Sequence, residues 1–409
     1  MNRLSNTISL GVISLALCVG IIGICFFWQN DEQAFIGDAV LFKESISLPL
    51  REKENRLFLN RLKDEIATKR IVLLGETLHE DGTSVSIKSN LVQYLHDSLN
   101  FNLLVFESGT MDIFQLQQAF SDGLTEIKQS NYIWPFWGKS CQSQELWQYI
   151  KQCKGQLRIA GIDCQPLGNT KNDSLYYSFV SEILLEKGIN VKEYPLFTKY
   201  IPSISRYHPE YQKRSSVDSL ASEIESVKSL IHEWSNLWTY LDGIQNYIQY
   251  SSLYPKAFIN ERVQWRDSVM FNNFKRCFDP NEDKVVVWCS NMHAAKGFPI
   301  GNQLIPNLGK RISSEYGDDV YVILFDNYSR HNLGQDGSPY YIGKHSSVEH
   351  VIHSSIHNEA SDDYWYFYKL DPFGDNVFSR LFEEERKLRV KTLADAIIYV
   401  DSMENIRYE

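Results

Sequence analysis

Six short apolar segments, rich in Val and Ile, recur along the 409-residue chain, and most do not alternate apolar with polar residues. Strands of this kind are covered on both faces, as in a parallel sheet between helices. Residues 84–100, between the first two segments, have helical apolar spacing, which completes a strand–helix–strand unit. The sequence therefore predicts an α/β fold with a mostly parallel central sheet flanked by helices. The segments are RIVLLG (70–75), NLLVFE (102–107), LRIAGID (157–163), KVVVWCSN (284–291), DVYVILFD (319–326) and AIIYVD (396–401).

The regions around these segments differ in character. Residues 170–280 lack such runs, and residues 217–249 have helical composition and apolar spacing, so we expect a helical insertion or subdomain there. Residues 327–360 are rich in Gly, His, Ser and Asn, which favours a loop. We expect residues 31–65 to form a juxtamembrane linker that leads into a helix, and residues 66–409 to form the main α/β domain.

The N-terminal residues have the composition of a membrane anchor. Residues 8–28 form a stretch of 21 residues without a charge, and about 20 residues span a bilayer as a helix. A secretory signal peptide, the alternative, usually has a shorter apolar region followed by an A-x-A pattern, which is absent here. Arg3 precedes the stretch, and Asp31 and Glu32 follow it. We therefore expect residues 1–30 to form an uncleaved single-pass anchor, with the catalytic domain extracytoplasmic, in the periplasm or at the cell surface.

The charge of the chain argues against a nucleic-acid partner. The formal net charge is -10 and Lys and Arg do not cluster, whereas phosphate binding needs clustered positive charge. The expected partners are a small-molecule substrate and, through the N-terminal helix, the membrane. The cysteines outside the apolar stretch are scattered and have no C-x-x-C zinc spacing.

Polar residues follow four of the predicted strands at the point where each ends. Glu76, Glu107 and Asp163 close the first three, and Asn291 closes the fourth, with His293 just beyond it. In open α/β sheets, ligands bind outside the carboxyl ends of the strands. Any one of these residues alone is ordinary turn chemistry, but together they favour a functional site at this edge of the sheet.

The spacing of Glu76 and His79 suits general-base chemistry. If the turn opens a helix, two side chains three residues apart can face the same crevice. A neighbouring carboxylate raises the basicity of an imidazole and fixes its tautomer, as activation of water requires. The sequence has no G-x-S-x-G elbow, no G-x-G-x-x-G segment and no Walker loop. Common serine hydrolases are therefore disfavoured, and no cofactor is expected.

A metal-dependent alternative stays open on the same residues. Glu76, His79, Glu107 and His293 could supply nitrogen and oxygen ligands to a divalent ion. The sequence lacks an H-E-x-x-H helix, and the four side chains come from dispersed elements. A site without a metal is therefore the stronger prediction.

The chain resembles the erythromycin esterase-like family in five segments that follow one another in the family's order. The family motifs are Gly-Glu-x-x-His with a later Lys, Phe-Glu, Gly-x-Asp, Arg-Asp-x-x-Met and Trp-x-x-Asn-x-His. The matching residues are Gly75, Glu76, His79 and Lys88, then Glu107, then Gly161 and Asp163, then Arg266, Asp267, Met270 and Asn273, and finally Trp288, Asn291 and His293.

The resemblance implies a parallel α/β core with helical additions and a hydrolase that uses no metal. Characterised members of the family open the lactone ester of macrolide antibiotics. By resemblance, His79 activates water with help from Glu76, while Glu107 and His293 line the same pocket. Lys88 stands at a basic position of the family site.

We expect Lys88, Asp163, Arg266 and Asn291 to bind substrate. Among these, Lys88 and Asn291, together with His293, would steady a developing oxyanion. The aromatic residues of the segment IWPFW (133–137) could line an apolar pocket, although core packing is their expected role; they are Trp134, Phe136 and Trp137.

Two positions beside His79 depart from the family pattern. Glu80 stands where the family usually has Gly, and Thr83 stands where many esterases carry Glu. Three functions therefore stay open. The first is a membrane-anchored hydrolase of an ester, lactone or related acyl bond. The second is a metal-dependent hydrolase or peptidase that uses the same Glu and His residues. The third is a catalytically inactive binding or envelope-assembly protein on the same scaffold.

Overall fold

The computed structural model describes residues 44–46, 55–124, 127–167, 170–208, 212–231, 236–252, 259–300, 303–330, 340–341, 347–356, 365–370, 377–379, 381–382 and 386–408. Within these ranges, no helix is both long and apolar enough to cross a membrane. The anchor predicted for residues 1–30 lies outside the described residues, as does much of the linker predicted for residues 31–65.

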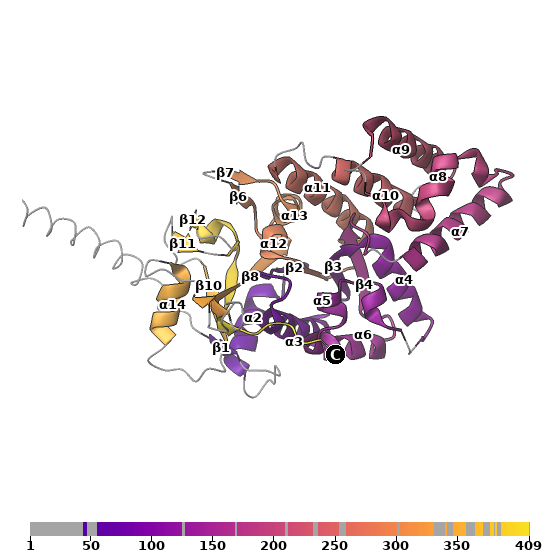
Figure 1. Cartoon of the computed structure of the whole chain (residues 1–409). Helices are drawn as coiled ribbons and strands as arrows, with labels where there is room; N and C mark the ends of the chain where they lie inside the picture. The colour runs from indigo at the N-terminus through magenta and orange to yellow at the C-terminus, as the bar shows by residue number, and fades with distance from the viewer. Residues whose placement is uncertain are drawn as a thin grey trace, which may run out of the picture.

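The centre of the fold is a mostly parallel sheet (Figure 1). Its strands follow the order β1-β10-β13-β8-β2-β5-β3-β4, and β9 pairs with β8. The six strands from β13 to β4 in this order pair in parallel. They are the six predicted segments, so the predicted parallel core is confirmed. Their bounds are β2 (Ile71–Leu74), β3 (Leu103–Gly109), β4 (Arg158–Asp163), β5 (Val285–Trp288), β8 (Val320–Arg330) and β13 (Ala396–Met403).

Antiparallel strands that the sequence patterns did not predict complete the sheet. β1 (Glu44–Ile46) pairs with β10 (Trp365–Lys369), and β10 pairs with β13. β9 (Tyr340–Tyr341) pairs with the end of β8. Two small hairpins stand apart, built from β6 (Phe298–Ile300) with β7 (Gln303–Ile305) and from β11 (Val377–Ser379) with β12 (Arg386–Leu388).

The helices occur between these strands along the chain. The α-helices of the described residues are α2 (Arg56–Ile66), α3 (Gly82–Leu99), α4 (Thr110–Ser121), α5 (Pro135–Gly138), α6 (Gln144–Gln152), α7 (Thr170–Glu186), α8 (Pro195–Tyr200), α9 (Arg214–Ser229), α10 (Asn236–Ser252), α11 (Ile259–Cys277), α12 (Asn291–Ala294), α13 (Leu308–Tyr316) and α14 (Val348–Ile356). Short 3₁₀ helices are η1 (Gln129–Asn131), η2 (Cys141–Ser143), η3 (Val191–Glu193), η4 (Ile201–Arg206), η6 (Gly317–Asp319) and η7 (Val390–Thr392).

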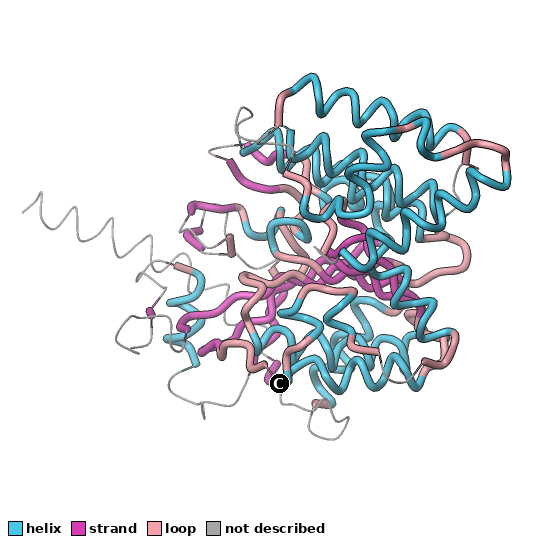
Figure 2. The backbone as a smooth tube through the Cα atoms, turned by 45° about the vertical axis from the view of Figure 1, so that its right-hand side comes forward, coloured by secondary structure: helices cyan, strands magenta, loops and turns pink. Residues whose placement is uncertain are grey.

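The two faces of the sheet bury separate apolar cores, because successive side chains of a strand point to opposite faces. Ile71 and Leu73 of β2 pack on one face, in a core that includes Phe274 of α11 and residues of α13. Val72 and Leu74 pack on the other face with residues of α2, α3 and α6. Figure 2 shows the strands between layers of helices. The sheet is therefore covered on both sides, as non-alternating apolar runs predict.

The helices of residues 170–252 have a core of their own. Val180 and Leu184 of α7, Leu220 of α9 and Leu241 of α10 are all buried in it. In Figure 1, α7, α8, α9 and α10 lie together at the end of the molecule opposite α14. α11 runs from this helical part back to the sheet, where Met270 and Phe274 join the sheet core. The helical part is thus joined to the sheet through α4, α11 and β4.

The loop predicted for residues 327–360 was wrong for the described part of that segment. β8 continues to Arg330, and α14 occupies residues 348–356. Val348 and Ile352 stand four residues apart and are both buried in the sheet core. A helix of this length carries too few apolar positions to produce a clear pattern among Gly, His and Ser.

Candidate active site

The carboxyl ends of four neighbouring strands bring the predicted site residues together. β2, β5, β3 and β4 lie side by side in the sheet. Glu76 follows β2, Glu107 and Asp163 lie in the ends of β3 and β4, and residues 289–293 follow β5. The sequence-based expectation that these separate runs deliver polar groups to one edge is therefore met by the topology.

Glu76 is the centre of the first half of the site. Its Oε1 lies 2.7 Å from Nδ1 of His79, and its Oε2 accepts a hydrogen bond of 2.7 Å from Nζ of Lys88. Lys88 also donates to the Cys289 carbonyl at 3.2 Å and lies 4.5 Å from the ring centre of Trp288. Glu76 and Lys88 are both fully buried. The opposite charges of Glu76 and Lys88 therefore compensate each other inside the protein, and each oxygen of the carboxylate contacts a different partner.

Local sequence explains how these side chains meet. Gly75 directly follows β2, and an added Cβ there would lie 2.1 Å from Oδ1 of Asn291, so this position needs glycine. The turn after it carries Glu76 and His79, and Asp81 caps α3 by accepting a 2.9 Å hydrogen bond from the Ser84 amide. Lys88 then lies on the face of α3 that packs toward the sheet.

His79 is the accessible member of this group, with about a third of its side chain exposed. Its ring stacks on Phe136 at 4.7 Å and meets Trp137 edge-on at 5.4 Å. Because the Glu76 carboxylate can only accept, Nδ1 of His79 carries the proton. Among the described residues nothing hydrogen-bonds to Nε2, so its lone pair is available.

The pKa of His79 is set by opposing effects. Burial alone would lower it, but the hydrogen bond to Glu76 and the nearby charge of Glu107 raise the pKa above its ordinary value. The imidazole of His79 is therefore a stronger base than that of a free histidine. Burial also lowers the pKa of Lys88, and the Glu76 carboxylate opposes that shift.

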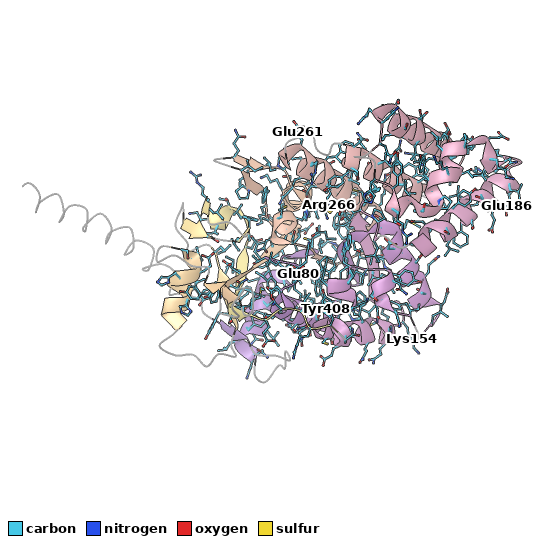
Figure 3. The ribbon with its side chains drawn as sticks, viewed as in Figure 1. Glu80, Lys154, Glu186, Glu261, Arg266 and Tyr408 are labelled. Carbon is cyan, nitrogen blue, oxygen red and sulfur yellow. The ribbon has the colours of Figure 1, made fainter. Side chains whose placement is uncertain are left out.

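Arg266 is the centre of the second half of the site. Its guanidinium donates to both carboxylate oxygens of Asp163, at 3.0 and 2.7 Å, and to Oε1 of Glu107 at 2.8 Å. Nη1 also lies 3.0 Å from Nε2 of His293. Figure 3 labels Arg266 between the helical part and the sheet. This fork-like pairing gives the planar cation a fixed orientation.

His293 is held between two carboxylates. Nδ1 lies 2.7 Å from Asp267 Oδ1, and Nε2 lies 3.2 Å from Glu107 Oε1. Burial alone would lower the pKa of His293, but Asp267 and Glu107 raise it to about 10. Burial alone would likewise raise the pKa of Glu107, but His293 and Arg266 hold it well below its usual range. His293 is therefore an imidazolium at neutral pH and not a base.

Asp267 matched the family's Arg-Asp-x-x-Met motif, but the sequence analysis gave it no role in the site. It orients His293 and accepts a 2.8 Å hydrogen bond from the Leu308 amide. Its neighbour Arg266 was expected to bind substrate, and the pair Arg-Asp in one motif was the available signal. The two residues are consecutive on α11 and have different partners, since Arg266 contacts Asp163 and Glu107 while Asp267 contacts His293.

The two halves of the site are connected through the end of β5. The Ser290 amide donates to Glu107 Oε2 at 2.9 Å, while the preceding Cys289 carbonyl accepts from Lys88. The Asn291 amide donates to the Glu76 carbonyl at 2.8 Å. Glu76 and Glu107 are thus both fixed to the same three-residue turn.

Asn291 holds backbone in place. Its side-chain amide donates to the Phe325 carbonyl at 2.7 Å and the Leu381 carbonyl at 2.8 Å, and its Oδ1 accepts from the Phe325 amide at 3.2 Å. The polar atoms of Lys88 and His293 are similarly engaged within the protein. The oxyanion role expected for these three residues stays a prediction, and Arg266, with 17% of its side chain exposed, is the more accessible cation.

A cavity of about 40 Å³ opens beside Asp163. The helical part supplies much of its lining, including Tyr176, Tyr240 and Tyr247, and the start of α4 supplies Thr110 and Asp112. No motif in the sequence marked these tyrosines, because their shared surface forms only when α7 and α10 pack on α4.

The acidic groups Glu76, Glu107 and Asp163 are paired with protein cations. Lys88 lies against Glu76, and Arg266 lies against Glu107 and Asp163. Within the described ranges, no group of three or more His, Cys, Asp or Glu side chains has the geometry to hold a metal ion. The metal-dependent alternative therefore lacks a ligand set in this part of the chain.

The His293 pKa predicts how stability depends on pH. The unfolded state loses this proton near the ordinary value of 6.5, whereas the folded state keeps it up to about 10. The stabilisation is therefore complete below about pH 6.5 and is lost as the pH rises toward 10, at about 1.4 kcal/mol per pH unit. Urea unfolding of the wild type and of His293→Gln across this pH range measures their free energies of unfolding. The wild type should be the more stable protein at low pH, and the difference between the two free energies should decrease as the pH rises. A constant difference would contradict the assignment.

Comparisons with known proteins agree with this architecture. The erythromycin esterase family model matches residues 96–389. A Bacillus subtilis (strain 168) protein named "Putative hydrolase YbfO" is 23% identical over 312 residues, which cover 67% of this chain and 68% of that protein.

Two solved structures share the fold. A Bacillus cereus protein superposes with a TM-score of 0.71 at 16% identity, covering 93% of this chain and 99% of that one. A mutant of the erythromycin esterase EreC in its open conformation superposes with a TM-score of 0.64 at 16% identity, covering 89% and 98%. The family model spans well over half of the sequence, from within α3 to just beyond β12, and the chain therefore belongs to the erythromycin esterase family.

Proposed function

We propose that this protein is a hydrolase in which His79 activates a water molecule for attack on an ester, lactone or related acyl bond. The observation that carries the proposal is the state of the His79 ring. Nδ1 is held by a buried carboxylate at 2.7 Å, about a third of the side chain is exposed, and no described residue hydrogen-bonds to Nε2. This arrangement gives a general base with a fixed tautomer and a free lone pair.

The reaction follows from that geometry. Nε2 of His79 takes a proton from water as the water oxygen attacks the acyl carbon. The imidazolium that forms is stabilised by the Glu76 carboxylate, whose second oxygen stays paired with Lys88. The protonated Nε2 then gives its proton to the leaving alkoxide as the acyl–oxygen bond breaks. Acid and alcohol are released, and His79 returns to its starting state.

We propose that Arg266 stabilises the negative charge that develops on the carbonyl oxygen of the substrate. It is a permanent cation held by Asp163 and Glu107, and part of its side chain is accessible. A cation fixed by buried partners stabilises a transition state without reorganising during the reaction. Phe136, stacked on His79, offers an apolar wall to the substrate. The erythromycin esterase among the relatives makes macrocyclic lactones one substrate class to test.

We also propose that residues 1–30 anchor this hydrolase in a membrane, with the catalytic part outside the cytoplasm. The support is the uncharged stretch of residues 8–28 with Arg3 before it. The full-length protein should stay with membranes after an alkaline wash. Protease added to cells whose cytoplasmic membrane is intact but whose outer envelope is permeabilised should degrade the catalytic domain. Release by the wash, or protection from the protease, contradicts the proposal.

Substitution of His79 tests the proposed mechanism. His79→Asn should lower kcat on a hydrolysed ester by roughly 10²–10⁴-fold, because the general base is lost. In the wild type, kcat/KM should rise with pH through an apparent pKa above 6.5, because only the neutral imidazole accepts a proton. The matched control is His96→Asn, since His96 lies at the last turn of α3 and pairs with Tyr149.

The outcomes separate the candidate functions. Equal activity of His79→Asn and the wild type would refute water activation by His79. A wild-type protein that hydrolyses nothing in a panel of esters, lactones and amides would favour the inactive binding protein. Loss of wild-type activity on chelation, restored by a divalent ion, would favour the metal-dependent alternative.

A further inference from the structure

A short segment after the last strand crosses the active-site edge of the sheet. Beyond β13, residues 404–408 run antiparallel to the turn that carries His79, with Asn405 opposite Asp81. The Gly82 amide donates to the Glu404 carbonyl at 2.9 Å, and the Ile406 amide donates to the Glu80 carbonyl at 3.0 Å. We refer to residues 404–408 as the strap. One isolated antiparallel bridge and these two hydrogen bonds attach the strap to residues 80–82, which closely follow His79.

The strap also forms hydrogen bonds with residues 141 and 142, which lie shortly after Phe136 and Trp137 in the chain. The Cys141 amide donates to the Arg407 carbonyl at 2.7 Å, and the Arg407 amide donates to Oε1 of Gln142 at 3.1 Å. Ser140 forms an isolated bridge with Tyr408. These residues begin η2, directly after α5, which carries Phe136 and Trp137.

The strap therefore joins the two segments that fix the imidazole. One segment supplies His79, and the other supplies the ring of Phe136 that stacks on it at 4.7 Å. Figure 3 labels Glu80 and Tyr408 near one another in the lower middle of the view. Because His79 is about one-third exposed, solvent borders one side of its ring. The position of the ring depends on the segments that carry and face it.

Two residues of α3, Gly82 and Thr83, contact the strap directly. A Cβ at Gly82 would lie 2.8 Å from the Asn405 carbonyl oxygen and 2.7 Å from Nε2 of Gln142, so only glycine allows this approach. The hydroxyl of Thr83 accepts a 2.9 Å hydrogen bond from the Glu404 amide. Thr83 is buried, and its hydroxyl is the protein acceptor that this amide would lose in a variant without the hydroxyl.

We propose that the strap is a positioning element that holds His79 against Phe136 in the geometry for attack, and that Thr83 is the residue that fastens it. The inference rests on the proposed function, since it assigns the strap a task in the same reaction. Its residues are positioning residues and do not touch the substrate. A displacement of about 1 Å at a catalytic base can lower a rate about 10²-fold.

The first test measures the strap without a substrate. Hydrogen–deuterium exchange is followed at the Cys141 amide, which is bonded to the strap but not to Thr83. Thr83→Val keeps the shape of the side chain and removes the acceptor, and should speed exchange at Cys141 and Gly82 roughly tenfold. Thr83→Ser keeps the hydroxyl and should restore the wild-type rate. Thr392→Val removes a hydroxyl from exposed η7, bonded to Arg389, and serves as the matched control.

The second test measures catalysis. Thr83→Val should lower kcat about tenfold while KM changes little, because the strap positions the base and not the substrate. Removal of residues 404–409 should lower kcat by about 10²-fold. Gly82→Ala, which displaces the strap by contact, should act in the same direction and replaces the deletion if that variant does not fold.

The two tests keep this inference distinct from the proposed function. If the wild type hydrolyses no substrate, the exchange rates still decide whether the strap fastens both segments, and unchanged exchange at Cys141 in Thr83→Val overturns it. If the wild type is active and His79→Asn is not, yet Thr83→Val and the strap deletion keep the wild-type kcat, the mechanism stands and the strap is refuted.

Discussion

The carboxylate of Glu76 is the interaction on which the site depends. It lies in the interior with no exposed surface, and its two oxygens are committed to His79 on one side and Lys88 on the other. A buried carboxylate needs such partners, because an isolated charge in the interior is strongly unfavourable. Lys88 supplies the compensating charge for one oxygen of Glu76, while the other oxygen holds Nδ1 of His79 and raises the pKa of its imidazole above the ordinary value. The turn after β2 and the start of α3 are shaped by this requirement, and the strap fastens the same turn from outside.

Arg266 has the corresponding place in the second half of the site. It gathers Asp163 from β4 and Glu107 from β3 around one guanidinium, and it reaches them from α11, which also belongs to the sheet core. His293 adds a second cation that Asp267 and Glu107 keep protonated. The protein therefore supplies two fixed cations, Arg266 and His293, in the same site as the imidazole of His79. In the proposed reaction, His79 accepts a proton from water while a fixed cation stabilises the negative charge on the carbonyl oxygen.

Sequence reasoning predicted the parts of the site that follow from strand order. Glu76, Glu107, Asp163 and His293 stand at or beyond strand ends, and a parallel sheet collects such ends at one edge. Asp267 was missed because its role depends on contact with Leu308, 41 residues later in the chain. The strap was missed because Glu404 and Thr83 are 321 residues apart and no repeated pattern joins them. Asn291 was expected at the substrate, but its amide holds the Phe325 and Leu381 backbone, a partnership that only the folded chain creates.

The coupling between the two halves of the site is the central claim, and the pKa of His79 reports it directly. Nitrogen-15 NMR titration of His79 in the wild type and in Glu107→Gln compares the same ring with and without the distant charge. The account predicts a wild-type pKa above 6.5 that falls in the variant, because Glu107 raises it through space. An ordinary value that is the same in both proteins would contradict a single, electrostatically connected site.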